Sequence, residues 1–145
     1  MKVECYWTDN INDKIYKESL EIRKKVFIGE LGSEPEVEIC DEDKCIFLLI
    51  YVDESPAATG RIELCGKVAK LQRIAVEKDF RGSGLGYLLI KTLERKALEK
   101  RCELIEICAS MRAYDFYRKL GYKEVGEKFL RCGIEHIIMR KEFTL

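Results

Sequence analysis

A glycine-rich turn between a strand-like run and a helix-like run constrains this chain more than any other feature. The stretch "IAVEKDFRGSGLG", residues 74–86, places apolar residues before Arg81 and then three glycines at alternate positions. Apolar side chains then recur at helical spacing up to about Lys100, at Leu85, Leu88, Leu89, Leu93 and Ala97. The pattern predicts a strand that passes into a helix through a turn with few side chains.

A turn of this kind suits an anion. The first turn of a helix presents unpaired N–H groups and positive dipole charge, and glycines let a ligand approach the backbone closely. Arg81 is placed to add a charge-assisted hydrogen bond to the same group. The alternative is that the glycines only permit a tight change from strand to helix.

Two common phosphate-binding loops do not match the turn. A P-loop has Lys and then Ser or Thr after its last glycine, whereas Gly86 is followed by Tyr87 and Leu88. The dinucleotide fingerprint needs a third glycine at position 89, where this chain has leucine. Nucleoside triphosphates and NAD are therefore disfavoured ligands.

The remaining pattern predicts a single α/β (α+β) domain over residues 1–145, a length suited to one core. A helix separates the runs at 68–76 and 104–109, so these two strands should be parallel in an otherwise mostly antiparallel sheet. We expect an irregular connection over the acidic residues 29–44 and a left-handed cap at Gly121. The predicted strands are 3–8, 45–52, 57–64, 68–76, 104–109, 122–129 and 135–142, and the predicted helices are 13–29, 84–100 and 111–120.

Composition narrows the class of protein. The 26 basic and 26 acidic residues balance, which disfavours nucleic acid or an anionic membrane as a partner. The N-terminus lacks a signal-peptide core, and the longest apolar run, 46–52, is too short to span a bilayer, so we expect a cytoplasmic protein. Seven scattered cysteines and one histidine fit neither a metal site nor a disulfide framework, and we expect the cysteines to be small buried side chains.

Two motifs resemble marks of the GNAT superfamily of acyl-CoA N-acyltransferases. One is R-x-x-G-x-G, formed by Arg81, Gly84 and Gly86, and the other is "AYDFYRKLGY" at 113–122. The predicted order of elements is similar over essentially the whole chain. The resemblance implies a mixed sheet, mostly antiparallel and twisted, with helices on both faces and a splay between the fourth and fifth strands.

A closer resemblance is to a small bacterial single-domain GNAT subgroup. It is carried by "RKKVFIGELG" at 23–32 and "GIEHIIMRK" at 133–141. Leu31 replaces a glutamine of that subgroup, and Leu130 and Arg131 occupy a region that is usually acidic. These departures leave the acceptor open but do not touch the glycine loop.

The resemblance implies acetyl-CoA, or another acyl-CoA, as cosubstrate and no metal. Its diphosphate would meet the N–H groups of residues 81–87, its pantetheine would pair with the strand edge at 74–76, and 110–117 would form the opposite wall. A backbone N–H near Ile74 or Val76 would stabilise the oxyanion. The implied cofactor-binding residues are Ile74, Ala75, Val76, Arg81, Gly82, Ser83, Gly84, Leu85, Gly86, Tyr87, Ser110, Phe116 and Tyr117.

The resemblance also implies roles in catalysis. Tyr117 holds the position of a general acid, with a core aromatic as the alternative. Glu30 and Glu63 are candidate bases, and solvated carboxylates are the alternative for both. Phe27, Glu30 and His136 are candidate acceptor-binding residues, although a lone histidine is more often structural.

The expected activity is transfer of an acetyl or short acyl group from CoA to a primary amine of a small molecule or peptide, by direct attack in a ternary complex. An inactive acyl-CoA sensor or interaction module of the same fold and a nucleotide-phosphate binder of another fold are the alternatives. The acidic residues within 34–43 favour a cationic acceptor or simply solvate a loop. Either a monomer or a homodimer fits the sequence.

Overall fold

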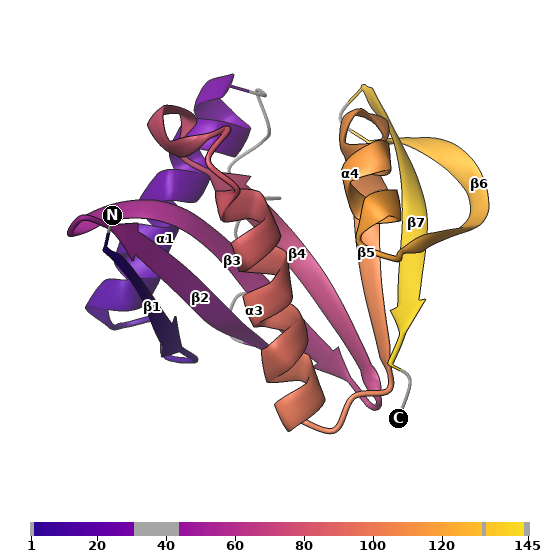
Figure 1. The fold of residues 1–145 in the computed structure, drawn as a ribbon, viewed down its shortest axis with the longest axis horizontal. Coiled ribbons are helices and arrows are strands. Elements are labelled where there is room, and N and C mark those ends of the chain that lie inside the picture. Colours follow the sequence, from indigo (N-terminus) through magenta and orange to yellow (C-terminus); the bar gives the residue numbers. More distant parts are fainter. Residues whose placement is uncertain (1, 31–43, 132, 144–145) are drawn as a thin grey trace.

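The computed structural model describes residues 2–30, 44–131 and 133–143, with the backbone alone at 28–30 (Figure 1). One seven-stranded sheet has the order β1-β2-β3-β4-β5-β7-β6. Among the described strands, only β4 and β5 pair in parallel, so the predicted mixed, mostly antiparallel sheet is confirmed. The strands are β1 (Val3–Thr8), β2 (Cys45–Val52), β3 (Ser55–Cys65), β4 (Val68–Val76), β5 (Leu104–Ser110), β6 (Lys123–Arg131) and β7 (Ile134–Glu142).

Helices cover both faces of the sheet (Figure 1). α1 (Lys14–Arg23) begins at Asp13, whose carboxylate accepts a hydrogen bond from Tyr16 N–H at 3.0 Å. It continues as the π-helical turn η1 (Lys24–Glu30), so the predicted helix 13–29 changes its hydrogen bonding at Lys24. The opposite face carries α3 (Leu85–Glu99) and α4 (Tyr114–Lys119).

Two short 3-10 turns lie beside the predicted elements, and the second takes the place of residues expected in a helix. η3 (Lys78–Phe80) follows β4, and η4 (Met111–Ala113) replaces the start of the helix predicted at 111–120. Ser110 causes the second change, because its hydroxyl accepts a hydrogen bond from Arg112 N–H at 3.2 Å. Gly121 has φ +98°, which confirms the predicted left-handed cap after α4.

The alternation of side chains along the strands divides the core between the two faces. The face under α3 and α4 holds the largest apolar cluster, in which Leu48, Ile62 and Ile107 pack with Leu89 and Leu93 of α3. The face under α1 holds a smaller cluster of Ile22, Val26, Leu49 and Ala75. The last residues of β4 are therefore packed from both faces.

A β-bulge in β4 opens the sheet. Thr59 pairs with Ala75 and Arg61 with Gln72, so Gly60 of β3 faces two residues of β4, Arg73 and Ile74. Arg73 has φ +54°, a left-handed conformation that costs a non-glycine residue about 1–2 kcal/mol. A Cβ at residue 60 would lie 2.8 Å from Leu93 Cδ1 and 2.9 Å from Ile74 Cδ1, so a larger residue there would displace these two side chains from the bulge.

The parallel pairing of β4 with β5 ends just before this bulge. Its pairs run from Val68 with Leu104 to Leu71 with Ile107, although β4 continues to Val76 and β5 to Ser110. The remaining residues of the two strands diverge, as Figure 1 shows. The predicted splay between the fourth and fifth strands is therefore confirmed, and the bulge supplies its physical cause.

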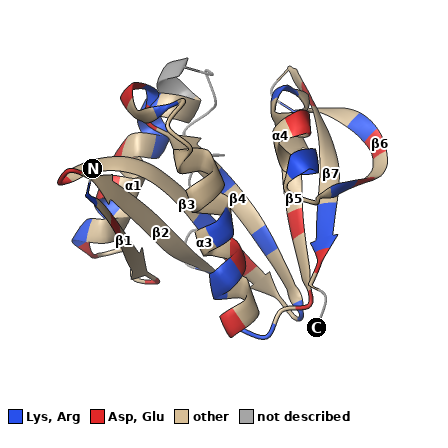
Figure 2. Cartoon of the chain, in the orientation of Figure 1, with Lys and Arg blue, Asp and Glu red and all other residues tan. Residues whose placement is uncertain are grey.

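The cysteine prediction is only partly correct. Cys45 and Cys102 are buried, but Cys5 lies exposed on the edge strand β1 and Cys65 lies exposed at the end of β3. Lys, Arg, Asp and Glu are interspersed over the helices and outer strands in the view of Figure 2. Among the described residues, no helix is both long and apolar enough to cross a bilayer.

Candidate active site

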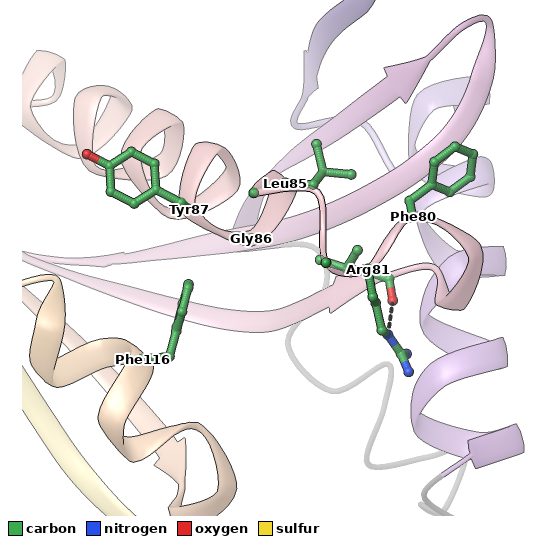
Figure 3. A pocket seen from close by; sticks show the side chains of 9 residues that line it. Phe80, Arg81, Leu85, Gly86, Tyr87 and Phe116 are labelled. Carbon is green, nitrogen blue, oxygen red and sulfur yellow. Dashed lines mark hydrogen bonds between the residues drawn. The ribbon is translucent and has the colours of Figure 1, made fainter. Parts of the chain in front are cut away.

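The glycine loop leaves β4 at its open end and begins α3. Gly82 and Gly84 both have φ +81°, and a Cβ at either position would meet no atom within 4 Å. The space beside the backbone is therefore open. Arg81 Nε donates to Val76 O at 3.0 Å, which fixes the loop to the end of β4 (Figure 3).

The loop presents backbone donors to that space. Within the part of the chain that the structure describes, the N–H groups from Gly82 to Tyr87 donate to no backbone carbonyl, and the bond from Leu88 N–H to Gly84 O, at 3.2 Å, is the first of the helix. Ser83 Oγ donates back to Phe80 O at 2.8 Å, so its side chain supports the turn. Backbone N–H groups that lack a partner within the helix, at the N-terminus of that helix, are well placed to bind phosphate oxygens.

A pocket of about 400 Å³ lies against the loop. The aromatic ring of Phe116, from α4, faces the start of α3 from the other side (Figure 3). A Cβ at residue 86 would lie 3.5 Å from that ring. The pocket is lined by Val76, Phe80, Arg81, Gly82, Gly84, Leu85, Gly86, Tyr87 and Phe116. It therefore joins the end of β4, the loop and α4.

Tyr117 lies beside Phe116 in the wall formed by α4. Its ring makes edge contacts with Phe116 and Tyr122, with centroids 5.2 and 5.9 Å away. The residue as a whole is only 7% exposed. Among the described residues, the Tyr117 hydroxyl makes no hydrogen bond, and it is not one of the fully enclosed polar atoms that lack such a bond. The hydroxyl therefore keeps some accessible surface.

Burial raises the pKa of Tyr117 to about 12, because the phenolate is poorly solvated there. The folded protein favours the neutral phenol, so the stability that this gives is present below pH 10 and is lost as the pH rises toward 12. We expect the tyrosinate absorbance of wild type minus Tyr117→Phe to titrate with a midpoint near 12. A midpoint near 10, the ordinary value of the phenol, would contradict this prediction.

Other predicted residues lie around the opening without lining the pocket. Ile74 and Ala75 belong to the diverging part of β4, on opposite faces of the sheet. Phe27 packs against the cluster that contains Ala75. Ser110 and His136 are paired across β5 and β7 at the other side of the opening.

His136 has structural contacts in addition to this position. Its Nδ1 lies 2.8 Å from Ile134 O, and its ring stacks on Phe129 with centroids 6.2 Å apart. The alternative interpretation, a hydrogen-bonded structural histidine, thus has direct support. An acceptor role for His136 stays a prediction.

Of the two candidate bases, the structure describes the side chain of Glu63 but not that of Glu30. Glu63 pairs with Lys70, which lies in the part of β4 that is still joined to β5, and it accepts a hydrogen bond from Cys65 Sγ at 3.4 Å. The fold therefore does not bring Glu63 to the loop or to Tyr117, and its alternative as a sheet-face carboxylate fits better. The side chain of Glu30 lies outside the described residues, as does the acidic segment 31–43.

Sequence patterns missed two features of the site. Phe80 lines the pocket, and its only signal was an apolar residue immediately before Arg81. The bulge at Arg73 gave no signal of its own, because arginine rarely adopts a left-handed conformation. The glycine opposite it, Gly60, was the available hint.

Comparison with known proteins decides the family. A family model described as an acetyltransferase (GNAT) domain matches residues 15–143. The chain belongs to the GNAT acetyltransferase family. This GNAT protein is 35% identical over 131 residues to YyaT, an uncharacterized protein of Bacillus subtilis (strain 168), with 88% of each chain covered. YjcF of the same organism, an uncharacterized N-acetyltransferase, is 33% identical over 133 residues, which cover 90% of this chain and 95% of YjcF.

Solved structures share the fold at lower identity. Escherichia coli ElaA superposes with a TM-score of 0.84 and 21% identity, and the superposition covers 97% of this chain and 100% of ElaA. A GNAT acetyltransferase from Elizabethkingia anophelis, solved with acetyl-CoA bound, superposes with a TM-score of 0.76 and 16% identity, covering 97% and 99% of the two chains. Family membership makes this GNAT protein an acyl-CoA-dependent N-acyltransferase.

Proposed function

We propose that this GNAT protein transfers an acetyl or other short acyl group from CoA to a primary amine of a small molecule or peptide, by direct attack within a ternary complex. The main support for the proposal is the pocket, because it lies between the N–H groups of the glycine loop that donate to no backbone carbonyl and the side chain of Phe116 on α4. The acetyl-CoA bound to the Elizabethkingia protein of the same fold supports the choice of cosubstrate.

The cosubstrate would lie across the opening of the sheet. Its diphosphate binds the N–H groups of residues 82–87, where two glycines leave open space beside the backbone. Its pantetheine follows the edge of β4 at Ile74–Val76, which has no paired residue in β5. This arrangement sets the thioester between β4 and the wall that contains Phe116 and Tyr117.

The chemical step needs proton transfers at two atoms. The amine nitrogen attacks the thioester carbonyl, the C–N bond forms, and a backbone N–H near Ile74 or Val76 stabilises the oxyanion. The C–S bond then breaks, and the sulfur takes a proton from the Tyr117 hydroxyl, which solvent later replaces. A phenol of pKa about 12 is neutral at physiological pH and therefore available as a donor.

The amine proton leaves through water to a carboxylate, and we propose Glu30 for that role. Glu30 ends η1, the turn that also places Phe27 against the cluster containing Ala75. Phe27, Glu30 and His136 are the proposed acceptor-binding residues. Phe27 and Glu30 belong to η1, which packs against the diverging part of β4, and His136 belongs to β7, which pairs with β5.

The proposal is tested by measuring CoA release from acetyl-CoA with a panel of amines. The panel contains a polyamine, an aminoglycoside, an amino sugar and a lysine peptide, and mass spectrometry identifies the acetylated nitrogen. We expect amine-dependent release with at least one class. Tight acetyl-CoA binding without turnover for any amine would instead support an inactive sensor.

A further inference from the structure

A cluster of polar side chains lies between α3 and the part of the sheet formed by β5, β7 and β6. The carboxylate of Glu94, in α3, is enclosed, with the residue 6% exposed. The Tyr122 hydroxyl donates to its Oε2 at 2.8 Å, and Lys141 Nζ of β7 lies 3.2 and 3.3 Å from its two oxygens. Lys91 Nζ lies 3.4 Å from Oε1. We call these four residues the Glu94 cluster.

The cluster connects parts of the molecule that the sheet no longer holds together. Beyond Leu71 and Ile107, β4 and β5 share no backbone pairs. The glycine loop and α3 follow β4, whereas α4 and β7 belong with β5, on the two sides of the opening in Figure 1. Side chains must therefore set the spacing between the loop and α4.

Tyr122 is the residue of the cluster that reaches Tyr117. Its N–H donates to Tyr117 O at 3.1 Å, and the two rings make an edge contact. Tyr122 is 1% exposed and Tyr117 7%, so both rings are closely packed in the core. A continuous series of contacts thus runs from α3 through Glu94 and Tyr122 to Tyr117.

The hydrogen bond between Tyr122 and Glu94 is well suited to fix a position. Burial, and next the charge of Glu94, raise the pKa of Tyr122, so its hydroxyl remains a donor at physiological pH. A bond between a phenol and a buried carboxylate is charge-assisted and directional. The two lysines compensate the buried negative charge, which would otherwise oppose folding.

We infer that Tyr122 is a positioning residue for acyl transfer: through its bond to Glu94, it holds the Tyr117 hydroxyl at a fixed place relative to the glycine loop. The inference rests on the proposed role of Tyr117 as the acid. Binding of the diphosphate uses the loop alone, whereas protonation of the sulfur depends on the spacing between the loop and α4. Loss of the bond should therefore affect turnover much more than cosubstrate affinity.

The test is a double-mutant cycle of Tyr122→Phe and Tyr117→Phe with acetyl-CoA and an accepted amine. Tyr122→Phe keeps the ring and removes the bond, and we expect kcat to fall about tenfold because small misplacements of a catalytic group are costly. The Kd for CoA should change by less than about twofold. In the Tyr117→Phe background, Tyr122→Phe should cause no further loss of kcat, because the acid that it positions is already absent.

Three further variants control for simple destabilisation. Tyr6→Phe removes a tyrosine–glutamate bond of the same length, 2.8 Å to Glu4, at the exposed strand β1, and should leave kcat unchanged. Glu94→Gln keeps an oxygen that accepts the hydrogen bond from the Tyr122 hydroxyl, whereas Glu94→Leu has none. When the two variants have the same thermal stability, Glu94→Gln should retain more activity. It also tests the inference if Tyr122→Phe folds poorly.

The outcomes separate the inference from the proposed function. If Tyr117→Phe lowers kcat but Tyr122→Phe does not, or if the two losses multiply, the positioning role of Tyr122 is overturned while the acid role stands. If Tyr117→Phe leaves kcat unchanged, the acid role fails and the inference fails with it. Equal activity of Glu94→Gln and Glu94→Leu would also overturn the inference.

Discussion

Replacing Tyr117 with phenylalanine is expected to lower kcat for acetyl transfer by about 100-fold, because positioned acids contribute about 10²–10⁴-fold to such reactions. The leaving thiolate, with a pKa of about 8.5, would depart without a proton donor. The ring of Phe fits the same site, since Tyr117 packs by edge contacts with Phe116 and Tyr122. Affinity for acetyl-CoA should therefore stay within about threefold of wild type.

Steady-state kinetics and calorimetric titration with CoA measure these two quantities separately. Tyr16→Phe is the matched control, because Tyr16 is also buried but packs on Phe47 in the face covered by α1. It should change neither kcat nor affinity. Unchanged turnover in Tyr117→Phe would remove the acid role and return Tyr117 to its alternative interpretation as a core aromatic.

Gly84→Val is expected to raise the Kd for CoA at least tenfold. Gly84 has φ +81° at the N-cap of α3, and a left-handed conformation costs a residue with a Cβ about 1–2 kcal/mol, more when the Cβ is branched. The loop would relax to another conformation and turn its N–H groups away from the diphosphate. A tenfold change corresponds to about 1.4 kcal/mol of binding free energy, which is within this cost.

The control for Gly84→Val is Gly66→Val, at the turn between β3 and β4. Gly66 has φ +62° and, like Gly84, open space where a Cβ would lie. Both variants should lose similar thermal stability, but Gly66→Val should bind CoA normally. Gly84→Asn should recover part of the affinity, because asparagine tolerates the left-handed region. Normal CoA binding by Gly84→Val would exclude the loop as the diphosphate site.

Local patterns were sufficient to predict the part of the fold that forms the loop. The change from strand to helical spacing at Gly84 located α3, and the long crossover made β4 and β5 parallel. These features depend on residues close in sequence and on chain connectivity. The splay itself was expected only from the resemblance, because its cause, the left-handed Arg73 opposite Gly60, involves two strands.

Long-range side-chain contacts were beyond the reach of the sequence. Glu94 follows Leu93 in an amphipathic helix and has the pattern of a solvated residue, yet it is buried against Tyr122 and Lys141. Glu63 was a candidate base alongside Glu30, but the strand register sets it beside Lys70. Which polar residues are buried depends on how separate helices and strands pack together. The hydrophobic periodicity within one element contains no information about that packing.

The central claim, that the loop over residues 82–87 binds the CoA diphosphate, is tested most directly by amide proton–nitrogen NMR spectra during titration with CoA. We expect the largest shift changes at Gly82, Gly84 and Gly86, with smaller changes along Ile74–Val76 and near Phe116. The same titration with Gly84→Val should show weaker, incomplete shifts. Saturable CoA binding that leaves the three glycine resonances unmoved would contradict the account.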